Sequence, residues 1–131
     1  MKLEFMEERD MDLMDAYKRV LRHYGKRAPF IKKSLLMLQT SKSPAKKFYV
    51  SEEQALRIVT RLYKGKDTYI KSREKVQMYH DILERVRDTI RPIDTLSLAI
   101  RRVIQQEAPR FYVTPETARI ILYRLMNNRK R

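Results

Sequence analysis

Basic side chains are the residues of this sequence with an evident chemistry, which is the binding of a polyanion. The 131 residues include 30 Lys and Arg against 16 Asp and Glu, a formal net charge of +14. The two signs are unevenly distributed, since residues 16–51 contain ten bases and no acid. Such an excess destabilises a compact chain through self-repulsion unless a polyanion relieves it. The composition therefore favours DNA, RNA or an anionic membrane surface as the partner.

A helical stripe of bases is the first candidate contact surface. Arg57, Arg61 and Lys64 are spaced by four and three residues, which places them on one face of a helix. Arg124 occupies the place of Arg61 in the second half of the chain, and Arg119 adds charge nearby. The stripe predicts contacts to phosphates. The alternative interpretation is an ordinary solvated helix face.

The second candidate surface combines bases with tyrosines just before two predicted helices. If Phe48 and Val50 point inward, alternation turns Tyr49 outward, and Tyr112 in the matching segment likewise. A tyrosine among bases can stack on a nucleobase or donate a hydrogen bond to a phosphate. The alternative is that each ring packs with only its rim exposed. The bases of this second surface are Lys42, Lys46, Lys47 and Arg110. Lys32 and Lys33, in the acid-free stretch, are also predicted to bind nucleic acid.

No arrangement of residues favours catalysis or a metal site. His23 and His80 are isolated, cysteine is absent, and no glycine-rich phosphate loop or HExxH motif occurs. Asp81, Glu84 and Asp88 share a helical face, but arginines adjoin them, so a salt-bridged surface explains them better. We therefore expect no enzymatic activity, no metal and no cofactor.

The chain contains an internal repeat at a spacing of 62 to 63 residues. The segment FYVSEEQA at 48–55 resembles FYVTPETA at 111–118, and Pro29 matches Pro92 at the same offset of 63. Further pairs in the same order are Tyr17 and Tyr79, Leu35 and Leu98, Ile58 and Ile121, and Arg61 and Arg124. Matches at several separated places indicate a tandem duplication.

Each copy is predicted to form three helices, because Gly is rare and apolar residues recur at helical spacing. The first copy gives helices at about 9–24 and 30–40, and one that begins at Ser51 and ends at Gly65. The second gives helices at about 72–90, 93–107 and 115–127. Ser51 and Thr114 are predicted N-caps, and Gly25 a predicted C-cap.

The predicted fold class is all-α, a tandem duplication of a three-helix unit with the two units packed together. A unit of about 60 residues is marginal by itself, which is the reason to expect that packing. The predicted organisation is an acidic N-terminal arm at 1–8, repeat 1 at 9–65, a linker at 66–71, repeat 2 at 72–128 and a basic tail at 129–131.

The chain has no feature of a membrane or secreted protein. No apolar run approaches the roughly 18 residues of a membrane span, and the N-terminal residues are acidic without an apolar signal region. The absence of cysteine fits a reducing compartment. These features predict a cytoplasmic protein.

The end of each copy resembles a trihelical, helix-turn-helix-type DNA-binding module. The segments SPAKKFYVSEEQALRIVTRLYKG and EAPRFYVTPETARIILYRLMNN carry the resemblance, which covers about 29–65 and 92–128. It implies that the third helix of each copy is a recognition helix. The residues so presented would be Gln54, Arg57 and Arg61 in the first copy, and Thr117, Arg119 and Arg124 in the second.

Together these features predict a non-enzymatic nucleic-acid-binding protein that contacts phosphates through Lys and Arg. Double-stranded DNA is the favoured partner, in the role of a small regulator or accessory factor of a phage or mobile element. Two alternatives stay open. One is a structural or adaptor protein that contacts a protein partner or a second copy through its helical repeats. The other is RNA binding, which charge alone does not separate from DNA binding.

Overall fold

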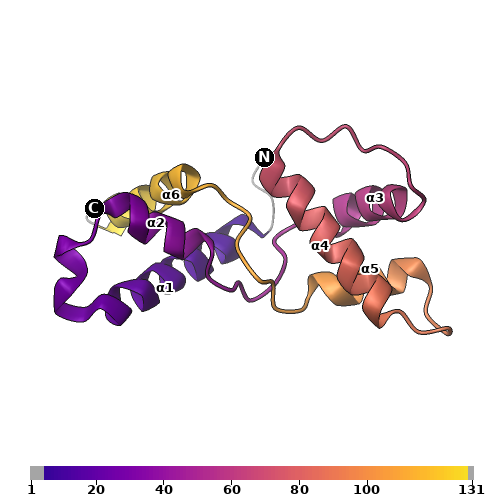
Figure 1. Ribbon diagram of the computed structural model, residues 1–131, viewed down its shortest axis with the longest axis horizontal. Helices are drawn as coiled ribbons and strands as arrows, with labels where there is room; N and C mark the ends of the chain where they lie inside the picture. The colour runs from indigo at the N-terminus through magenta and orange to yellow at the C-terminus, as the bar shows by residue number, and fades with distance from the viewer. Residues whose placement is uncertain (1–4, 130–131) are drawn as a thin grey trace. The chain divides into compact units, whose positions relative to one another are not determined.

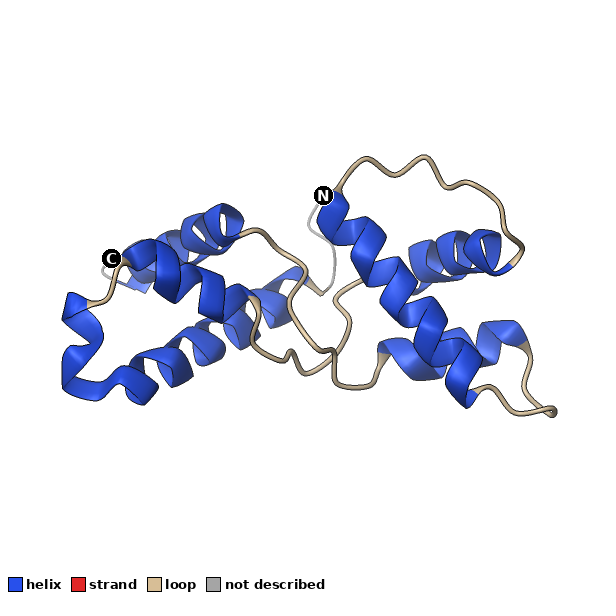
Figure 2. Ribbon diagram, viewed as in Figure 1, coloured by secondary structure: helices blue, strands red, loops and turns tan. Residues whose placement is uncertain are grey.

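The computed structural model describes residues 5–129, which form helices joined by loops, with no strand among them (Figure 1 and Figure 2). The prediction of an all-α fold is confirmed. The helices are α1 (Met6–Tyr24), a short 3₁₀ helix η1 (Gly25–Phe30), α2 (Lys33–Ser41), α3 (Glu52–Tyr63), α4 (Arg73–Thr89), α5 (Leu96–Ile104) and α6 (Pro115–Arg129).

The starts of α3 and α6 are fixed by side-chain caps, as predicted. The Ser51 hydroxyl oxygen accepts a hydrogen bond from the Gln54 N–H at 3.2 Å, and the Thr114 hydroxyl oxygen accepts one from the Thr117 N–H at 3.1 Å. Each bond satisfies a backbone donor that the first helical turn leaves without an internal partner. Pro115 is the first residue of α6, where its missing N–H is not needed.

The ends of α1 and α3 depend on the two glycines of the chain. Gly25 has φ +57° and donates its N–H to the Leu21 carbonyl. Gly65 has φ +75°; its N–H donates to the Leu62 carbonyl while the Lys66 N–H donates to the Arg61 carbonyl, both at 2.9 Å. This pair of bonds is a Schellman motif, which requires a left-handed residue and so favours glycine. The predicted helix ends at Gly25 and Gly65 are confirmed.

Several boundaries differ from those predicted. The helix α1 begins at Met6, so residues 6–8 of the predicted acidic arm are helical. Residues 25–30 form η1, and the second helix therefore begins at Lys33 rather than near 30. The fifth helix occupies only Leu96–Ile104. The predicted basic tail begins at Arg129, which is the last residue of α6. Residues 130–131 of this tail and residues 1–4 of the acidic arm lie outside the described residues.

The helices form two compact units, and each unit combines helices from both predicted repeats. Unit 1 spans 1–45 and 109–131 and contains α1, α2 and α6; unit 2 spans 46–108 and contains α3, α4 and α5. Within each unit the three helices pack against one another. The compact units therefore do not follow the predicted boundaries 9–65 and 72–128. The third helix of predicted repeat 1, α3, packs in unit 2, and the third helix of predicted repeat 2, α6, packs in unit 1. We call this arrangement the helix exchange. The duplication itself stays a prediction from the sequence.

An equivalent backbone hydrogen bond anchors the exchanged helix in each unit. In unit 2 the Phe48 N–H donates to the Ile104 carbonyl at 3.1 Å, and in unit 1 the Phe111 N–H donates to the Ser41 carbonyl at 3.1 Å. Donors and acceptors both correspond at the offset of 63 residues. The Phe48 and Phe111 rings are buried, as predicted. The segment that precedes each exchanged helix is thus tied to the C-terminal end of the second helix of its unit.

Each unit has its own apolar core, made by the helix faces that the 3.6-residue spacing brings together. The core of unit 1 includes Leu13, Ala16, Leu36, Met37, Ala118 and Leu122. The core of unit 2 includes Ala55, Val59, Ile82, Val86, Ile100 and Val103. Val50 and Val113, predicted to point inward, are only half-buried.

The exchange of helices predicts which fragments fold. A fragment of residues 46–108 contains all of unit 2 in one uninterrupted chain, whereas a fragment of 5–65 contains two helices of unit 1 and one of unit 2. We expect 46–108 to melt cooperatively as a monomer, with an unfolding free energy of at most about 5 kcal/mol. Circular dichroism of 5–65 should show less helix per residue, since isolated helices of this length are marginal in water. A 5–65 monomer that melts cooperatively would contradict the exchange.

Candidate nucleic-acid interface

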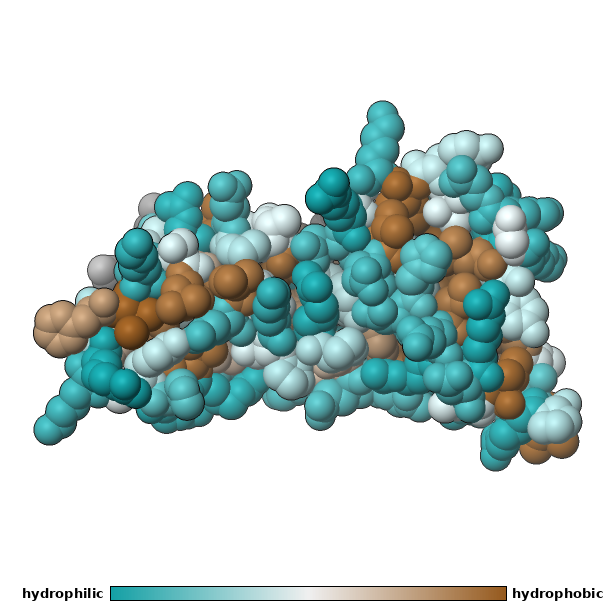
Figure 3. Space-filling model, in the orientation of Figure 1, coloured by the Kyte–Doolittle hydropathy of each residue, from teal (hydrophilic) through white to brown (hydrophobic). Residues whose placement is uncertain are grey.

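Unit 1 has eight exposed bases on α1, η1 and α2 or directly beside α2. They are Lys18, Arg19, Arg22, Lys26, Arg27, Lys32, Lys33 and Lys42. We call them the unit 1 basic surface. Residues 16–45 contain no acid. Among residues 5–129 no ion pair joins any of the eight to a carboxylate. Figure 3 shows hydrophilic side chains along this part of unit 1, over α1. Within residues 5–129, therefore, no carboxylate neutralises the positive charge of this surface.

The geometry of α1 explains why its bases face outward. Leu13 and Tyr17 are buried against the rest of unit 1. Successive residues of a helix are about 100° apart, so Lys18 and Arg22 lie one turn from each other and point away from the buried stripe. The periodicity that buries the apolar side chains thus fixes the direction of the basic ones.

Two predicted site residues from different helices of unit 1 meet at one tyrosine. Lys33 Nζ lies 5.5 Å from the centroid of the Tyr123 ring, and Arg119 Cζ lies 5.8 Å from it. The Tyr123 side chain is 37 % exposed. Cation–π contacts orient the two charges without neutralising them. Sequence reasoning missed Tyr123, although its spacing of four residues from Arg119 on a predicted helix was a usable signal.

Unit 2 has no such cluster at the corresponding place. The offset of 63 residues relates Lys33, Arg119 and Tyr123 to Leu96, Leu56 and Thr60 respectively. All three residues of unit 2 are half-buried. The basic and aromatic character of this surface is therefore particular to unit 1.

The predicted site residues are divided between the two units. Unit 1 contains Lys32, Lys33, Lys42, Arg110, Tyr112, Arg119 and Arg124, and unit 2 contains Lys46, Lys47, Tyr49, Arg57, Arg61 and Lys64. Lys46, Arg57 and Lys64 are exposed, whereas Lys47 and Arg110 are half-buried. The structure thus brings Lys33 and Arg119 together at Tyr123 in unit 1, and places the predicted stripe of Arg57, Arg61 and Lys64 on and just after α3 in unit 2.

Arg61 and Arg124, predicted to contact phosphates from matching positions, both hold intramolecular contacts. Arg61 donates from Nη2 to the Asp67 carbonyl at 2.8 Å and so fastens the chain beyond the end of α3. Arg124 Nη2 lies 2.8 Å from Asp10 Oδ2 and links α6 to α1. Their guanidinium groups therefore contribute to the packing of each unit.

Arg57 remains exposed on α3, where it lies near a buried phenol. The Tyr79 hydroxyl donates to Gln54 Oε1 at 3.4 Å. Burial raises the pKa of Tyr79, and the positive charge of Arg57 opposes that rise. Gln54, expected to face DNA by the helix-turn-helix resemblance, thus also binds α4.

The prediction that Tyr49 and Tyr112 face outward is wrong. Their exposed fractions are 8 % and 7 %, and Lys47 and Arg110 lie over their rings at 5.9 and 5.4 Å. Alternation requires an extended strand, and neither segment provides one. The Val50 N–H donates to the Phe48 carbonyl, which makes a tight turn at Tyr49, and Tyr112 has φ +57°. The alternative interpretation, in which the rings pack, is the correct one.

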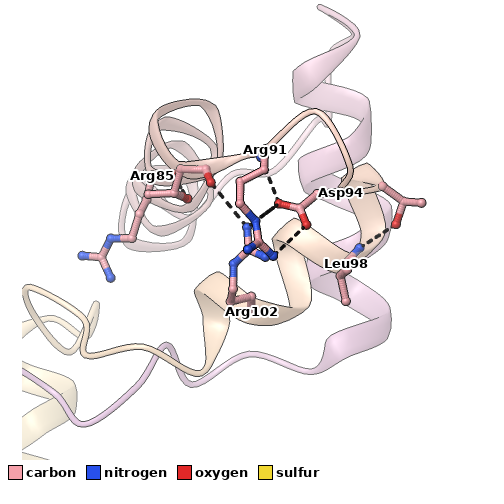
Figure 4. Close-up of polar contacts among 7 residues, drawn as sticks. Arg85, Arg91, Asp94, Leu98 and Arg102 are labelled. Carbon is pink, nitrogen blue, oxygen red and sulfur yellow. Dashed lines mark hydrogen bonds and ion pairs between the residues drawn. The ribbon is translucent and has the colours of Figure 1, made fainter.

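Arginines of unit 2 hold the turn between α4 and α5 (Figure 4). The Asp94 carboxylate accepts from the Arg91 N–H at 2.9 Å and from Arg102 Nη2 at 2.8 Å, and Arg91 Nη2 lies 3.2 Å from it. These hydrogen bonds hold the pKa of Asp94 well below its usual range. Elsewhere in unit 2, Arg101 forms an ion pair with Glu52. Three arginines of unit 2, Arg91, Arg101 and Arg102, thus pair with a carboxylate of the same unit.

Comparisons with protein-family models, with curated proteins and with solved structures found no match. Within residues 5–129 no helix combines the length and apolarity that a membrane crossing requires. The same residues contain no cluster of three or more His, Asp or Glu arranged to hold a metal ion. The assignment of the interface therefore depends on its charge, exposure and geometry alone.

The Asp94 contacts predict a pH dependence of stability. Because the folded-state pKa is lowered, the stabilisation by Asp94 is complete above the ordinary carboxyl pKa of about 4 and is lost as the pH falls below it. We expect the thermal midpoint of the Asp94→Asn variant to lie below that of the wild type at pH 6. The difference should shrink at pH 3. A difference that is constant between these two pH values would show that the charge of Asp94 does not stabilise the turn.

Proposed function

We propose that this chain is a non-enzymatic nucleic-acid-binding protein whose preferred partner is double-stranded DNA. The unit 1 basic surface contacts the phosphates. The observation that carries the proposal is the exposure of eight bases in a region that has no acid and in which none of them forms an ion pair within the described residues.

The contrast with other arginines of the chain supports this assignment. Arg9, Arg91, Arg102 and Arg124 each pair with an aspartate, so their charges are used within the fold. The bases of the unit 1 basic surface repel one another and have no such compensation. Binding to a phosphate backbone relieves that repulsion and releases the counterions condensed on the DNA. Binding of a polyanion therefore compensates the positive charge that is not paired with a carboxylate among the described residues of unit 1.

The distribution of the bases favours contacts to the DNA backbone over the reading of base edges. All eight bases lie between residues 18 and 42, on α1, η1 and α2 or directly beside α2, and so outside α6, which the sequence resemblance assigns to recognition. In that helix, α6, the Thr117 hydroxyl is bonded to the Thr114 hydroxyl at 3.0 Å and Arg124 to Asp10. Phosphate contacts fix position and orientation but carry no sequence information. We therefore expect binding with little sequence preference.

Removal of bases from this surface should weaken DNA binding and its dependence on salt. The variant Lys18→Gln, Arg22→Gln, Lys26→Gln is compared with the wild type by fluorescence anisotropy on a labelled duplex over a range of salt concentrations. Each lost phosphate contact should lower the slope of log K against log salt by roughly 0.9, so the slope falls by up to about 3. Binding by the wild type that ignores salt would rule out the proposal.

A matched control removes three exposed bases from unit 2. Lys66, Lys71 and Lys75 are exposed, so the variant Lys66→Gln, Lys71→Gln, Lys75→Gln has the same net charge as the unit 1 variant. We expect it to keep most of the wild-type affinity and slope. Equal losses in both variants would mean that net charge, and not the unit 1 basic surface, governs binding. Competition with single strands and with structured RNA distinguishes the RNA alternative.

A hollow between α2 and α6 favours the adaptor alternative as a second candidate function. It has a volume of about 640 Å³, and its lining includes Leu35, Leu38 and Pro115. At the positions of unit 2 that match Leu38 and Pro115, the ion pair of Arg101 with Glu52 is found instead. An apolar hollow with polar surroundings suits a protein segment. Light scattering coupled to size exclusion, without nucleic acid, should reveal a fixed oligomer if this function is the correct one.

A further inference from the structure

Each unit exposes an apolar side chain at the turn that precedes its second helix. Phe30 in unit 1 is 87 % exposed and Ile93 in unit 2 is 83 % exposed. The two residues correspond at the offset of 63, and each follows a proline. Figure 3 shows brown atoms that project over the turn between α1 and α2, and others over the turn between α4 and α5. The same unusual exposure thus occurs at matching places in both units.

Both turns are held by specific contacts. In unit 2, Ile93 lies between Arg91 and Asp94, and the Asp94 N–H donates to the Arg91 carbonyl at 2.9 Å while its carboxylate binds Arg91 and Arg102 (Figure 4). In unit 1, Phe30 ends η1, and the Ile31 N–H donates to the Ala28 carbonyl at 3.1 Å. The prolines fix one backbone dihedral angle in each turn. The two apolar side chains therefore project from constrained turns.

The surroundings of both side chains are positive. Lys26, Arg27, Lys32 and Lys33 lie within four residues of Phe30, and all four are exposed members of the unit 1 basic surface. The acid next to Ile93 is Asp94, whose carboxylate is shared by two arginines and whose side chain is 1 % exposed. A phosphate that approaches the Phe30 turn thus meets four exposed bases, and within four residues of Ile93 the one acid, Asp94, is already paired with Arg91 and Arg102.

We propose that Phe30 and Ile93 are wedges that insert between base pairs of a bound duplex and kink it. This inference rests on the proposed function. Proteins that bend DNA commonly place a Phe, Leu, Ile, Met or Pro side chain between two base pairs while bases hold the flanking phosphates. A constrained apolar side chain beside exposed bases has the components of that arrangement. Since each wedge is a single apolar side chain, it is small enough to enter between two base pairs but offers a membrane little area for insertion.

The proposal is tested by DNA bending measured as energy transfer between dyes at the two ends of a short duplex. The full-length wild type should increase the transfer, and the Phe30→Ala, Ile93→Ala double variant should lose most of that increase. The wild type should also prefer a duplex with a central nick over an intact one by roughly tenfold, because the nick already removes part of the unstacking cost. The double variant should lose most of this preference.

Two controls separate loss of the wedge from loss of the fold or of electrostatic binding. Because both side chains are more than four-fifths exposed, the double variant should melt at the wild-type temperature. Its salt slope should also equal that of the wild type, since no base is removed. The variant Tyr69→Asn removes an exposed aromatic residue, 80 % exposed at φ +57°, from another loop and should bend DNA as the wild type does.

The outcomes distinguish the wedges from the proposed function. If the wild type binds no duplex, both proposals fail. If it binds with a steep salt dependence but does not bend the duplex, or if the double variant bends it equally, the wedges are wrong and the proposed function stands. If the double variant loses binding to vesicles of anionic phospholipid while it bends DNA normally, the two side chains contact a membrane instead, which also overturns the proposal.

Discussion

The backbone hydrogen bonds from Phe48 to Ile104 and from Phe111 to Ser41 mark the points on which the rest of this architecture depends. Each ties the segment before a third helix to the second helix of a unit formed largely by the other predicted repeat. The buried phenylalanine rings at these points make the attachment costly to break, since a large aromatic side chain would return to water. Unit 1 is discontinuous in the sequence as a result, because the whole of unit 2 lies between α2 and α6.

The helix exchange also determines which charges are brought together. In unit 1 it brings α6 to α1 and α2, so that Arg124 reaches Asp10 and Arg119 shares the Tyr123 ring with Lys33. In unit 2 it brings Glu52, at the start of α3, to Arg101 of α5. The arginines near these contacts are used to join helices. The bases of the unit 1 basic surface on α1 and η1 form no ion pair between helices among the described residues. They differ in this from Arg101 and Arg124, whose charges stabilise the packing of helices.

The local structure followed from particular residues. Ser51 and Thr114 cap α3 and α6 because a short hydroxyl side chain can reach an N–H of the first helical turn. Gly25 and Gly65 end α1 and α3 because glycine adopts a positive φ without strain. The orientation of Tyr49 and Tyr112 was not predicted correctly in this way. Alternation holds only in an extended segment, and the turn at Tyr49 and the left-handed backbone at Tyr112 remove it. The candidate site was predictable only in part. The exposure of Lys32 and Lys33 followed from their residue type. The ion pair of Arg124 with Asp10 could not be predicted, because the two residues lie 114 positions apart in the sequence.

The sequence by itself determined the all-helical class, the capped starts at Ser51 and Thr114, the helix ends at Gly25 and Gly65, and the excess of positive charge, because these depend on residue type and on neighbours within a few positions. It also contains the similarity at a fixed offset from which the repeat is predicted. Only the tertiary structure decided which helix completes which unit, because the packing of α6 on α1 and α2 joins segments that lie far apart in the sequence. The tertiary structure also decided which bases form contacts within the fold and which face outward. An ion pair such as Arg124 with Asp10 exists only after the chain has brought its two ends into one unit.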